Sequence, residues 1–340
     1  MTKHSPDKFI PKDRFGGEFA IYWGTMWAVI SLVLYLNFSV VDPQATRPLW
    51  FIIATTSLEE IGLLIAGCLC WRNWQSKYIA GGSEVWLLYA LANFAFFIGN
   101  LWFTLWESLW KLDPAASFGN LFFVLFYLLT IAGVRLAILD RDVRLVPQQW
   151  AIVIGVAAIG MTIGCGLTAG AANATTTPPI ATQIVSTRVP ASGTSIAISA
   201  PTILATASGS QITLTTSERP PEWVLAIDRS LYPLVKTFNM FYVLCDLVLL
   251  TLATILFLGF WGGQMGLPWR MTAQAVLCFY IADTWFASAH ERVQGYESGS
   301  IMEVFWIFGI VQFGIAAALE FDNSIRARRL ARRRTAISKT

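Results

Sequence analysis

The chain has 340 residues, of which 55% are hydrophobic and only 13% are charged, and its formal net charge is +3. Water-soluble globular proteins carry about 25% charged residues, and they cannot bury apolar runs as long as those found here. The composition therefore excludes a soluble globular protein and predicts an all-α, polytopic integral membrane protein.

Eight segments are apolar over roughly the 20 residues that a helix needs to cross the hydrocarbon layer. In chain order they are residues 19–41, 49–71, 85–107, 117–139, 149–169, 235–260, 270–290 and 299–319. Residues 1–18 contain Lys and Asp side chains but no apolar stretch, so we expect no removable signal peptide. Eight transmembrane helices are therefore predicted, and insertion is expected to start at the first.

Most of the 24 basic residues fall on one side of the membrane when eight helices are assumed. They lie in the N-terminal segment, in the loops after the second and fourth helices, and in the C-terminal tail. Because cytoplasmic loops retain positive charge during insertion, both termini are expected in the cytoplasm, as in a bacterial inner membrane protein. Seven helices would place one of the two terminal basic clusters outside.

Composition divides the chain into five parts. They are a cytoplasmic segment at 1–18, the first four-helix half within 19–170, an outer loop at 171–228, the remainder of the second half at 229–320, and a basic cytoplasmic tail at 321–340. The helix at 149–169 belongs to the second half. The stretch 171–221 is rich in Thr, Ser, Ala and Pro, which fits either a flexible linker or short hairpin strands over the outer mouth.

The two halves resemble each other at a fixed separation. A shift of 183 residues superposes one set of residues on another: Ile98, Asn100, Trp102, Phe103, Ser117 and Asn120 on Ile281, Asp283, Trp285, Phe286, Ser300 and Glu303. With a further slip of three residues, Glu60 falls on Asp246. We therefore expect two parallel four-helix repeats about an axis along the membrane normal, with chance similarity between apolar sequences as the competing explanation.

Ionisable and amide side chains occur at matching depths in the two halves, in the outer half of the membrane. An ionisable group within hydrocarbon costs about 2.5 to 3.5 kcal/mol on insertion scales, so each one calls for a partner or a role. The candidate ligand-binding residues are Glu60, Asn100, Asn120, Asp246, Asp283 and Glu303, with the aromatic residues Tyr242, Trp285, Tyr296 and Trp306. Interhelical hydrogen bonding, a pocket open to the outside, and proton or cation handling all remain open.

The sequence offers no pattern for catalysis or for a metal site. It contains no Ser-His-Asp order, Gly-rich phosphate loop or paired-His helix, and all five cysteines lie within apolar segments. No catalytic or metal-ligating residue is therefore assigned, an enzyme is not favoured, and the cofactor stays unknown. The Arg-rich tail predicts contact with membrane lipids rather than with nucleic acid.

Several of these residues carry a resemblance to a known family. Tyr242, Asp246, Asp283, Tyr296 and the stretch 299–306 resemble the multi-helix membrane sensor region that precedes diguanylate cyclase and phosphodiesterase domains in many bacteria. The resemblance covers about 85–140 and 235–320 and implies a sensor whose pocket contains the matching residues.

The chain departs from the family pattern in two ways. Asn100 and Asn120 stand where the family usually has Asp, which puts a first-half site in doubt. The sequence also ends without a cytoplasmic output domain, so a signal would pass to a separate protein.

The leading hypothesis is a stand-alone membrane sensor or ligand-binding module with a polar pocket in the outer half of the bilayer. One alternative is a proton- or cation-coupled transporter or a carboxylate-using membrane enzyme. Another is an accessory subunit of a larger membrane complex. The expected partners are membrane lipids and either a separate cytoplasmic signalling protein or such a complex, and the ligand is not specified.

Overall fold

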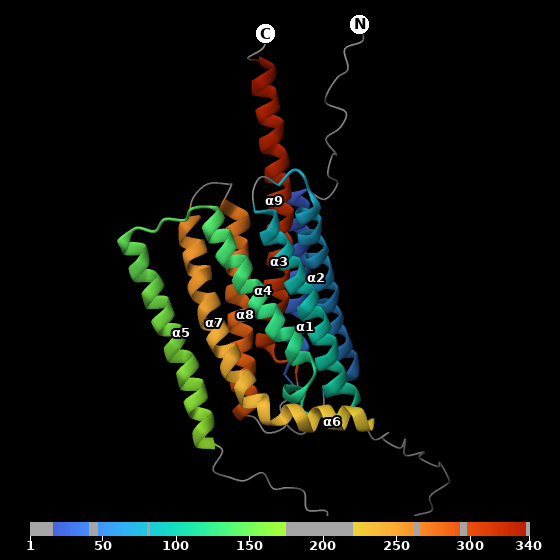
Figure 1. Ribbon diagram of the computed structural model, residues 1–340. Helices are drawn as coiled ribbons and strands as arrows, with labels where there is room; N and C mark the ends of the chain where they lie inside the picture. Colours follow the sequence, from blue (N-terminus) through green and yellow to red (C-terminus); the bar gives the residue numbers. More distant parts are fainter. Residues whose placement is uncertain are drawn as a thin grey trace, which may run out of the picture.

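A computed structural model describes residues 16–40, 47–79, 82–174, 220–261, 266–292 and 298–337. Within these ranges the chain is helical without strands, and eight of the helices are long (Figure 1). They are α1 (Gly17–Phe38), α2 (Leu49–Gln75), α3 (Ser83–Thr104), α4 (Gly119–Asp140), α5 (Pro147–Ala174), α7 (Val235–Gly259), α8 (Leu267–Arg292) and α9 (Val304–Ile337). The short ones are η2 (Leu105–Leu109), η3 (Pro114–Ala116), α6 (Glu222–Leu231), η4 (Tyr232–Leu234) and η6 (Ile301–Glu303).

Seven helical segments of the described ranges are long and apolar enough to cross a membrane. They are Gly17–Phe38, Leu49–Gln75, Ser83–Leu109, Gly119–Asp140, Pro147–Gly164, Glu222–Gly259 and Ile301–Ala331. The 26-residue α8 is not among them because its residues are less apolar. The all-α fold is thus confirmed within the described residues, and seven of the eight expected spans are long and apolar enough for a multi-pass membrane protein.

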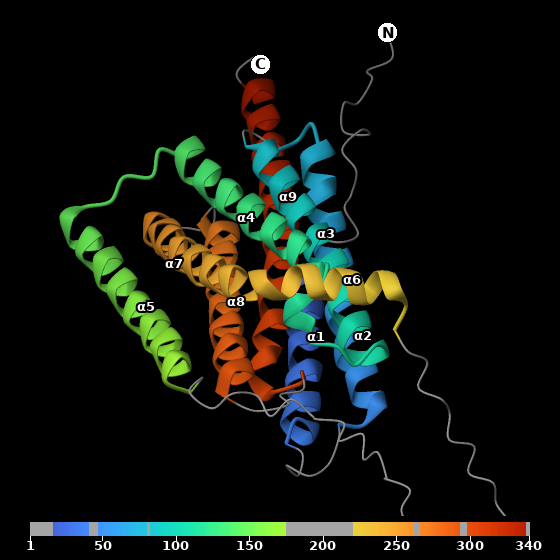
Figure 2. The same ribbon diagram turned by 60° about the horizontal axis from the view of Figure 1, so that its bottom comes forward.

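The start of α1 lies beside the C-terminal part of α9, at what we call the tail end of the bundle. Gly17 is so close to Leu319 that a methyl group there would collide with the leucine, and Arg326 Nη2 lies 4.0 Å from Glu18 Oε1. Beyond this point α9 projects out of the bundle (Figure 1). The opposite end, which we call the α6 end, is crossed by α6 lying at a steep angle to the long helices (Figure 2).

Helix α9 is the central element of the bundle. It packs against α1, α2 and α8. In its most apolar stretch, 72% of the residues are buried, compared with 11% in α1 and 17% in α5. Helix α3 lies between α2 and α4, while α7 contacts α4, α5 and α8. Whatever moves α9 must therefore change its contacts with helices from both halves of the chain.

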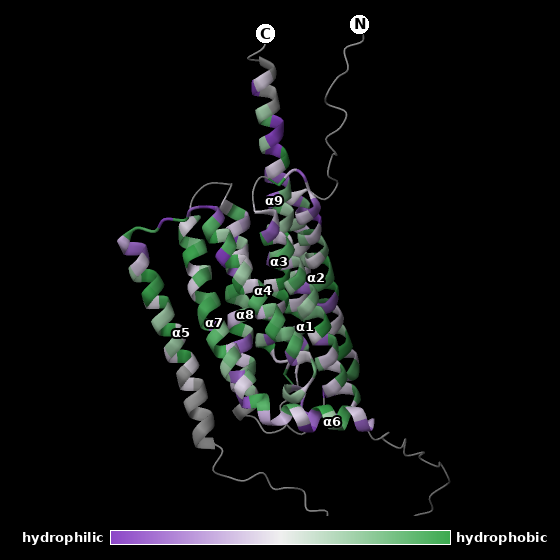
Figure 3. Ribbon diagram, in the orientation of Figure 1, coloured by the Kyte–Doolittle hydropathy of each residue, from purple (hydrophilic) through white to green (hydrophobic). Residues whose placement is uncertain are grey.

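The outer faces of the helices are apolar. On α1, for example, Val29, Ile30 and Val33 are all about half exposed. Hydrophobic residues cover the bodies of the helices, whereas hydrophilic residues concentrate near the ends and in the projecting part of α9 (Figure 3). Such an exposed apolar surface is suited to contact with lipid chains.

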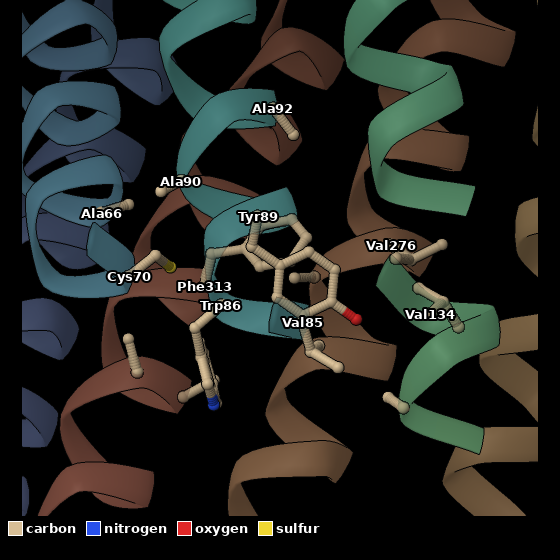
Figure 4. Packing of buried hydrophobic residues seen from close by; sticks show 14 of the residues in the cluster. Ala66, Cys70, Val85, Trp86, Tyr89, Ala90, Ala92, Val134, Val276 and Phe313 are labelled. Carbon is tan, nitrogen blue, oxygen red and sulfur yellow. The ribbon is translucent and has the colours of Figure 1, made fainter. Parts of the chain in front are cut away.

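Large aromatic side chains fill the interior nearer the tail end. Trp86 and Tyr89 of α3 are fully buried, and the Tyr89 ring lies 5.3 Å from that of Phe313 in α9. Cys70 of α2 and Val276 of α8 belong to the same cluster (Figure 4). Helices from both halves therefore share one hydrophobic core.

Helices α3 and α4 approach closely at the α6 end, where Gly99 faces Gly119. A Cβ atom on Gly119 would lie 2.6 Å from the Gly99 carbonyl oxygen, a distance that side chains do not tolerate. Glycine is therefore required for this contact. It fixes the start of α4 against α3 and thereby the positions of Asn100 and Asn120.

One boundary differs from the sequence expectation. Residues 171–228 were expected to form an outer loop, but its last part contains most of the helix α6, which continues through η4 into α7. Pro221 precedes the first residue of α6, and Pro233 lies within η4, where a proline interrupts the regular α-helical hydrogen bonding. The linker and hairpin alternatives concern residues that fall almost entirely outside the described ranges.

Candidate functional site

Asp283 of α8 is held by donors from two other helices. Tyr127 Oη of α4 donates to Asp283 Oδ2 at 2.7 Å, and Trp306 Nε1 of α9 donates to Oδ1 at 2.7 Å. Hydrogen bonds to a carboxylate are stronger than neutral ones, so these two contacts tie α4, α8 and α9 together.

Asp246 of α7 joins the same group of residues. Its side chain is buried, with 5% exposure, and it interacts with both Tyr127 and Asp283. Tyr242, one turn earlier on α7, donates to Asn120 Oδ1 at 2.7 Å and stacks on Tyr127 with ring centroids 5.3 Å apart. We call these five residues, Asn120, Tyr127, Tyr242, Asp246 and Asp283, the tyrosine cluster.

A second polar region lies between α2, α3 and the start of α9. It surrounds a small cavity of about 40 Å³, which we call the carboxylate cavity. Its polar lining includes Thr55, Thr56, Glu59, Asn100, Glu107, Ser298 and Glu303, and its aromatic lining consists of Tyr35, Phe103 and Trp306. This volume exceeds the roughly 10 to 15 Å³ that a single water molecule requires, so the space admits a small group.

Two of the lining carboxylates hold the loop before α9. Glu303 Oε2 accepts the Gly299 N–H at 2.6 Å, and its Oε1 accepts the Ser300 N–H at 3.2 Å as part of a capping box. Glu107 Oε1 accepts the Ser298 N–H at 3.0 Å. Arg47 Nη1 donates to the Gly299 carbonyl at 2.7 Å. The cavity wall is therefore fixed by charged side chains.

The third lining carboxylate, Glu59, differs from these two. Glu59 and its neighbour Glu60 are each only 8% exposed. Asn100 interacts with both, yet Glu59 Oε1 and both oxygens of Glu60 lack a hydrogen-bond partner among the described residues. An unsatisfied buried acceptor costs about 1 to 3 kcal/mol, so these oxygens favour any donor that can reach them. Of the two, only Glu59 lines the cavity.

Trp306 connects the two regions. Its indole N–H binds Asp283 in the tyrosine cluster, while its side chain also lines the carboxylate cavity. Because Trp306 lies in the first turn of α9, a change on either side of it acts on the same helix.

The structure brings together most of the residues expected in the site. Asn120, Tyr242, Asp246, Asp283 and Trp306 meet around the tyrosine cluster, and Glu60, Asn100 and Glu303 lie in or beside the carboxylate cavity. Trp285 is placed differently. It is 40% exposed and donates to Ser300 Oγ at 2.9 Å, so it contacts the loop before α9 but does not line the carboxylate cavity. Tyr296 lies outside the described residues.

Sequence reasoning missed Tyr127 as a site residue, along with Glu59 and Glu107. Tyr127 lies in an otherwise apolar stretch, where an isolated tyrosine gives no signal of its own. Glu59 was recognisable as a buried acid. Side chains at adjacent helix positions, such as Glu59 and Glu60, point about 100° apart, so which of the two faces a cavity depends on where α3 and α9 lie around α2.

No group of three or more His, Cys, Asp or Glu side chains in the described residues has a geometry that would hold a metal ion. Comparison with known proteins gives no further guide, because no family model, characterised protein or solved structure matches this chain. The chemistry of the two polar regions must therefore carry the functional argument.

Proposed function

We propose that the chain crosses a cell membrane eight times, with α8 as the remaining span and both termini in the cytoplasm. Helix α8 is long enough and lies between α7 and α9. The juxtaposition of Gly17 with Leu319 supports an even number of crossings, and the basic tail supports a cytoplasmic location for that end. The α6 end then faces outward.

The eight helices form two parallel repeats. Three aromatic contacts join residues that are 183 positions apart: Trp86 with Trp269 at 5.6 Å, Phe96 with Phe279 at 5.5 Å, and Phe103 with Phe286 at 5.7 Å between ring centroids. A two-fold axis brings each residue on it against its own counterpart, so these contacts support an axis between α3 and α8. Helix α2 packs against α9, and their counterparts in the repeat, α7 and α4, likewise pack against each other. Helices α1 and α5 do not follow this symmetry.

The protein acts as a membrane sensor or ligand-binding module whose pocket opens toward the α6 end. The observation that carries this proposal is the Glu59 carboxylate, which is buried, lacks a partner for Oε1 among the described residues, and lines a cavity. A purely structural network would be expected to satisfy such a group from within the protein. A polar group left open at a cavity is typical of a binding site.

Helix α9 is suited to carry the state of the pocket to the tail end. Glu303 and Trp306 place its start at the cavity, and Glu320 Oε1, about halfway along the helix, forms an ion pair of 3.0 Å with Arg141 Nη2. A continuous helix of 34 residues spans about 50 Å. Its basic tail would lie against anionic lipids or contact a separate cytoplasmic signalling protein.

Transport of protons or cations is the second candidate. It is favoured by the position of Trp306, which donates to Asp283 in the tyrosine cluster and also lines the carboxylate cavity. A transporter requires those groups to connect with both sides of the membrane, whereas a sensor requires access from one side only.

Cysteine labelling in intact cells tests the outward-facing pocket. In a background without the five native cysteines, Ser108→Cys at the cavity lining should react with an impermeant thiol reagent added outside. Leu330→Cys, which is 58% exposed in the tail, should react only after permeabilisation. Labelling of Ser108→Cys only after permeabilisation, or not at all, would rule out this site and orientation.

A further inference from the structure

The carboxylate cavity offers hydrogen-bond acceptors and an excess of negative charge. Glu59, Glu107 and Glu303 line it, and Arg47 reaches its edge through the Gly299 carbonyl. Glu107 and Glu303 already accept backbone N–H groups, but Glu59 Oε1 accepts none in the described residues. The missing group is therefore a donor, and a positively charged one fits best.

The size and the walls of the cavity narrow the class of that donor. Pockets for drug-sized ligands measure about 300 to 1,000 Å³, so a volume of about 40 Å³ admits only a small group. The aromatic side chains of Tyr35, Phe103 and Trp306 line the same space. Aromatic faces attract ammonium groups, and a carboxylate beside them supplies the counter-charge.

The other half of the molecule shows what completes an equivalent position. In the proposed repeat, Thr56 corresponds to Tyr242 and Glu303 corresponds to Asn120. On the Tyr242 side, the phenol donates to Asn120 at 2.7 Å and fills the space beside it. On the Thr56 side, the smaller side chain leaves the cavity open. Space that a phenol ring fills in one half is thus left for a ligand in the other, while Glu303, the counterpart of Asn120, already accepts backbone N–H groups.

We propose that the carboxylate cavity binds the cationic head of a small primary amine, with Glu59 as its counter-ion and Phe103 and Trp306 as its aromatic walls. This inference rests on the proposed binding function and specifies its ligand class. The ammonium N–H groups supply a donor to the Glu59 carboxylate, whose Oε1 has no hydrogen-bond partner among the described residues.

The test is titration of methylammonium chloride into the purified full-length chain in lipid nanodiscs, followed by calorimetry at an ionic strength held constant with NaCl. Saturable binding is expected. Glu59→Gln should weaken it at least about thirtyfold, because an uncharged amide cannot neutralise a buried ammonium group. The exposed acid of α6 provides the control, since Glu222→Gln should leave affinity within about twofold.

A second pair of variants tests the cavity without changing charge. Thr56→Tyr should place a phenol where the equivalent half has one and abolish binding. Phe103→Leu should weaken binding about two- to fivefold through loss of an aromatic face. If Thr56→Tyr fails to fold, as judged by size-exclusion chromatography, Glu59→Gln and Phe103→Leu still decide the question.

Three results would overturn the amine assignment: no saturable binding, equal affinity in Glu59→Gln, or equally effective competition by Na⁺. Such a failure remains distinguishable from failure of the proposed function. If Ser108→Cys is labelled from outside while methylammonium does not bind, the outward pocket stands and only the ligand class is wrong. If Ser108→Cys is not labelled from outside, the pocket itself is wrong.

Discussion

Replacing Tyr127 by Phe removes one hydroxyl group from the centre of the tyrosine cluster. That hydroxyl donates to Asp283 Oδ2 at 2.7 Å and interacts with Asp246, so its loss leaves two buried carboxylates with one donor fewer. The ring is retained and still stacks on Tyr242. The change therefore isolates the polar contribution of Tyr127.

Hydrogen bonds to charged groups contribute about 1.5 to 3 kcal/mol, and neutral ones about 0.5 to 1.5 kcal/mol. Tyr127→Phe should accordingly lower the free energy of unfolding by about 1.5 to 3 kcal/mol. Tyr242→Phe removes a donor from the neutral Asn120 amide, so it should cost about 1 kcal/mol. Tyr232→Phe, at a position 65% exposed, should have an effect near zero.

SDS-induced unfolding in mixed micelles measures these differences on the full chain. The expected order of destabilisation is Tyr127→Phe, then Tyr242→Phe, then Tyr232→Phe. Equal stability of Tyr127→Phe and Tyr232→Phe would show that no buried carboxylate depends on the Tyr127 hydroxyl, and the tyrosine cluster would then have no energetic basis.

Three further outcomes are expected. Gly119→Val should destabilise the protein by about 1 to 3 kcal/mol in the same assay, because a Cβ atom at this position has no room against α3. Gly155→Val is the matched control, since a Cβ atom there would lie in open space. Equal effects of the two substitutions would contradict the close α3–α4 contact. Glu320→Gln should lower the free energy of unfolding by about 1 to 3 kcal/mol, because it removes the 3.0 Å ion pair with Arg141. An unchanged unfolding curve would show that this ion pair does not stabilise α9. Under an imposed proton gradient, proteoliposomes should accumulate no more methylammonium than protein-free liposomes, whereas additional uptake by the proteoliposomes would favour the transporter.

The long helices could be predicted from the sequence because apolar length is a strong signal. The segments predicted at 49–71 and 117–139 correspond to α2 and α4 within a few residues at each end. Helix α6 was not predicted, because it is short and amphipathic and has no long apolar run. Val224 is its single buried residue. Its position across the α6 end depends on tertiary contacts, including a hydrogen bond of 3.3 Å from Trp106 Nε1 to Asp228 Oδ1.

The candidate site could be predicted in part. Burial of Glu60, Asp246 and Glu303 could be predicted from the sequence, since ionisable residues in apolar helices are conspicuous. The capping role of Glu303 could also be predicted, because Ser300 and Glu303 have the spacing of a capping box. The partners of Asp283 were not readable, because Tyr127 and Trp306 come from other helices whose rotation the sequence does not specify.

The most direct measurement is the distance between a bound amine and the Glu59 carboxylate. Solid-state NMR recoupling between ¹⁵N-methylammonium and ¹³C-labelled glutamate side chains, in membranes containing the full chain, reports contacts of about 4 Å or less. Dephasing in the native protein that disappears in Glu59→Gln but persists in Glu222→Gln is the expected result. Dephasing that survives in Glu59→Gln, or none in the native protein, would contradict binding at the carboxylate cavity.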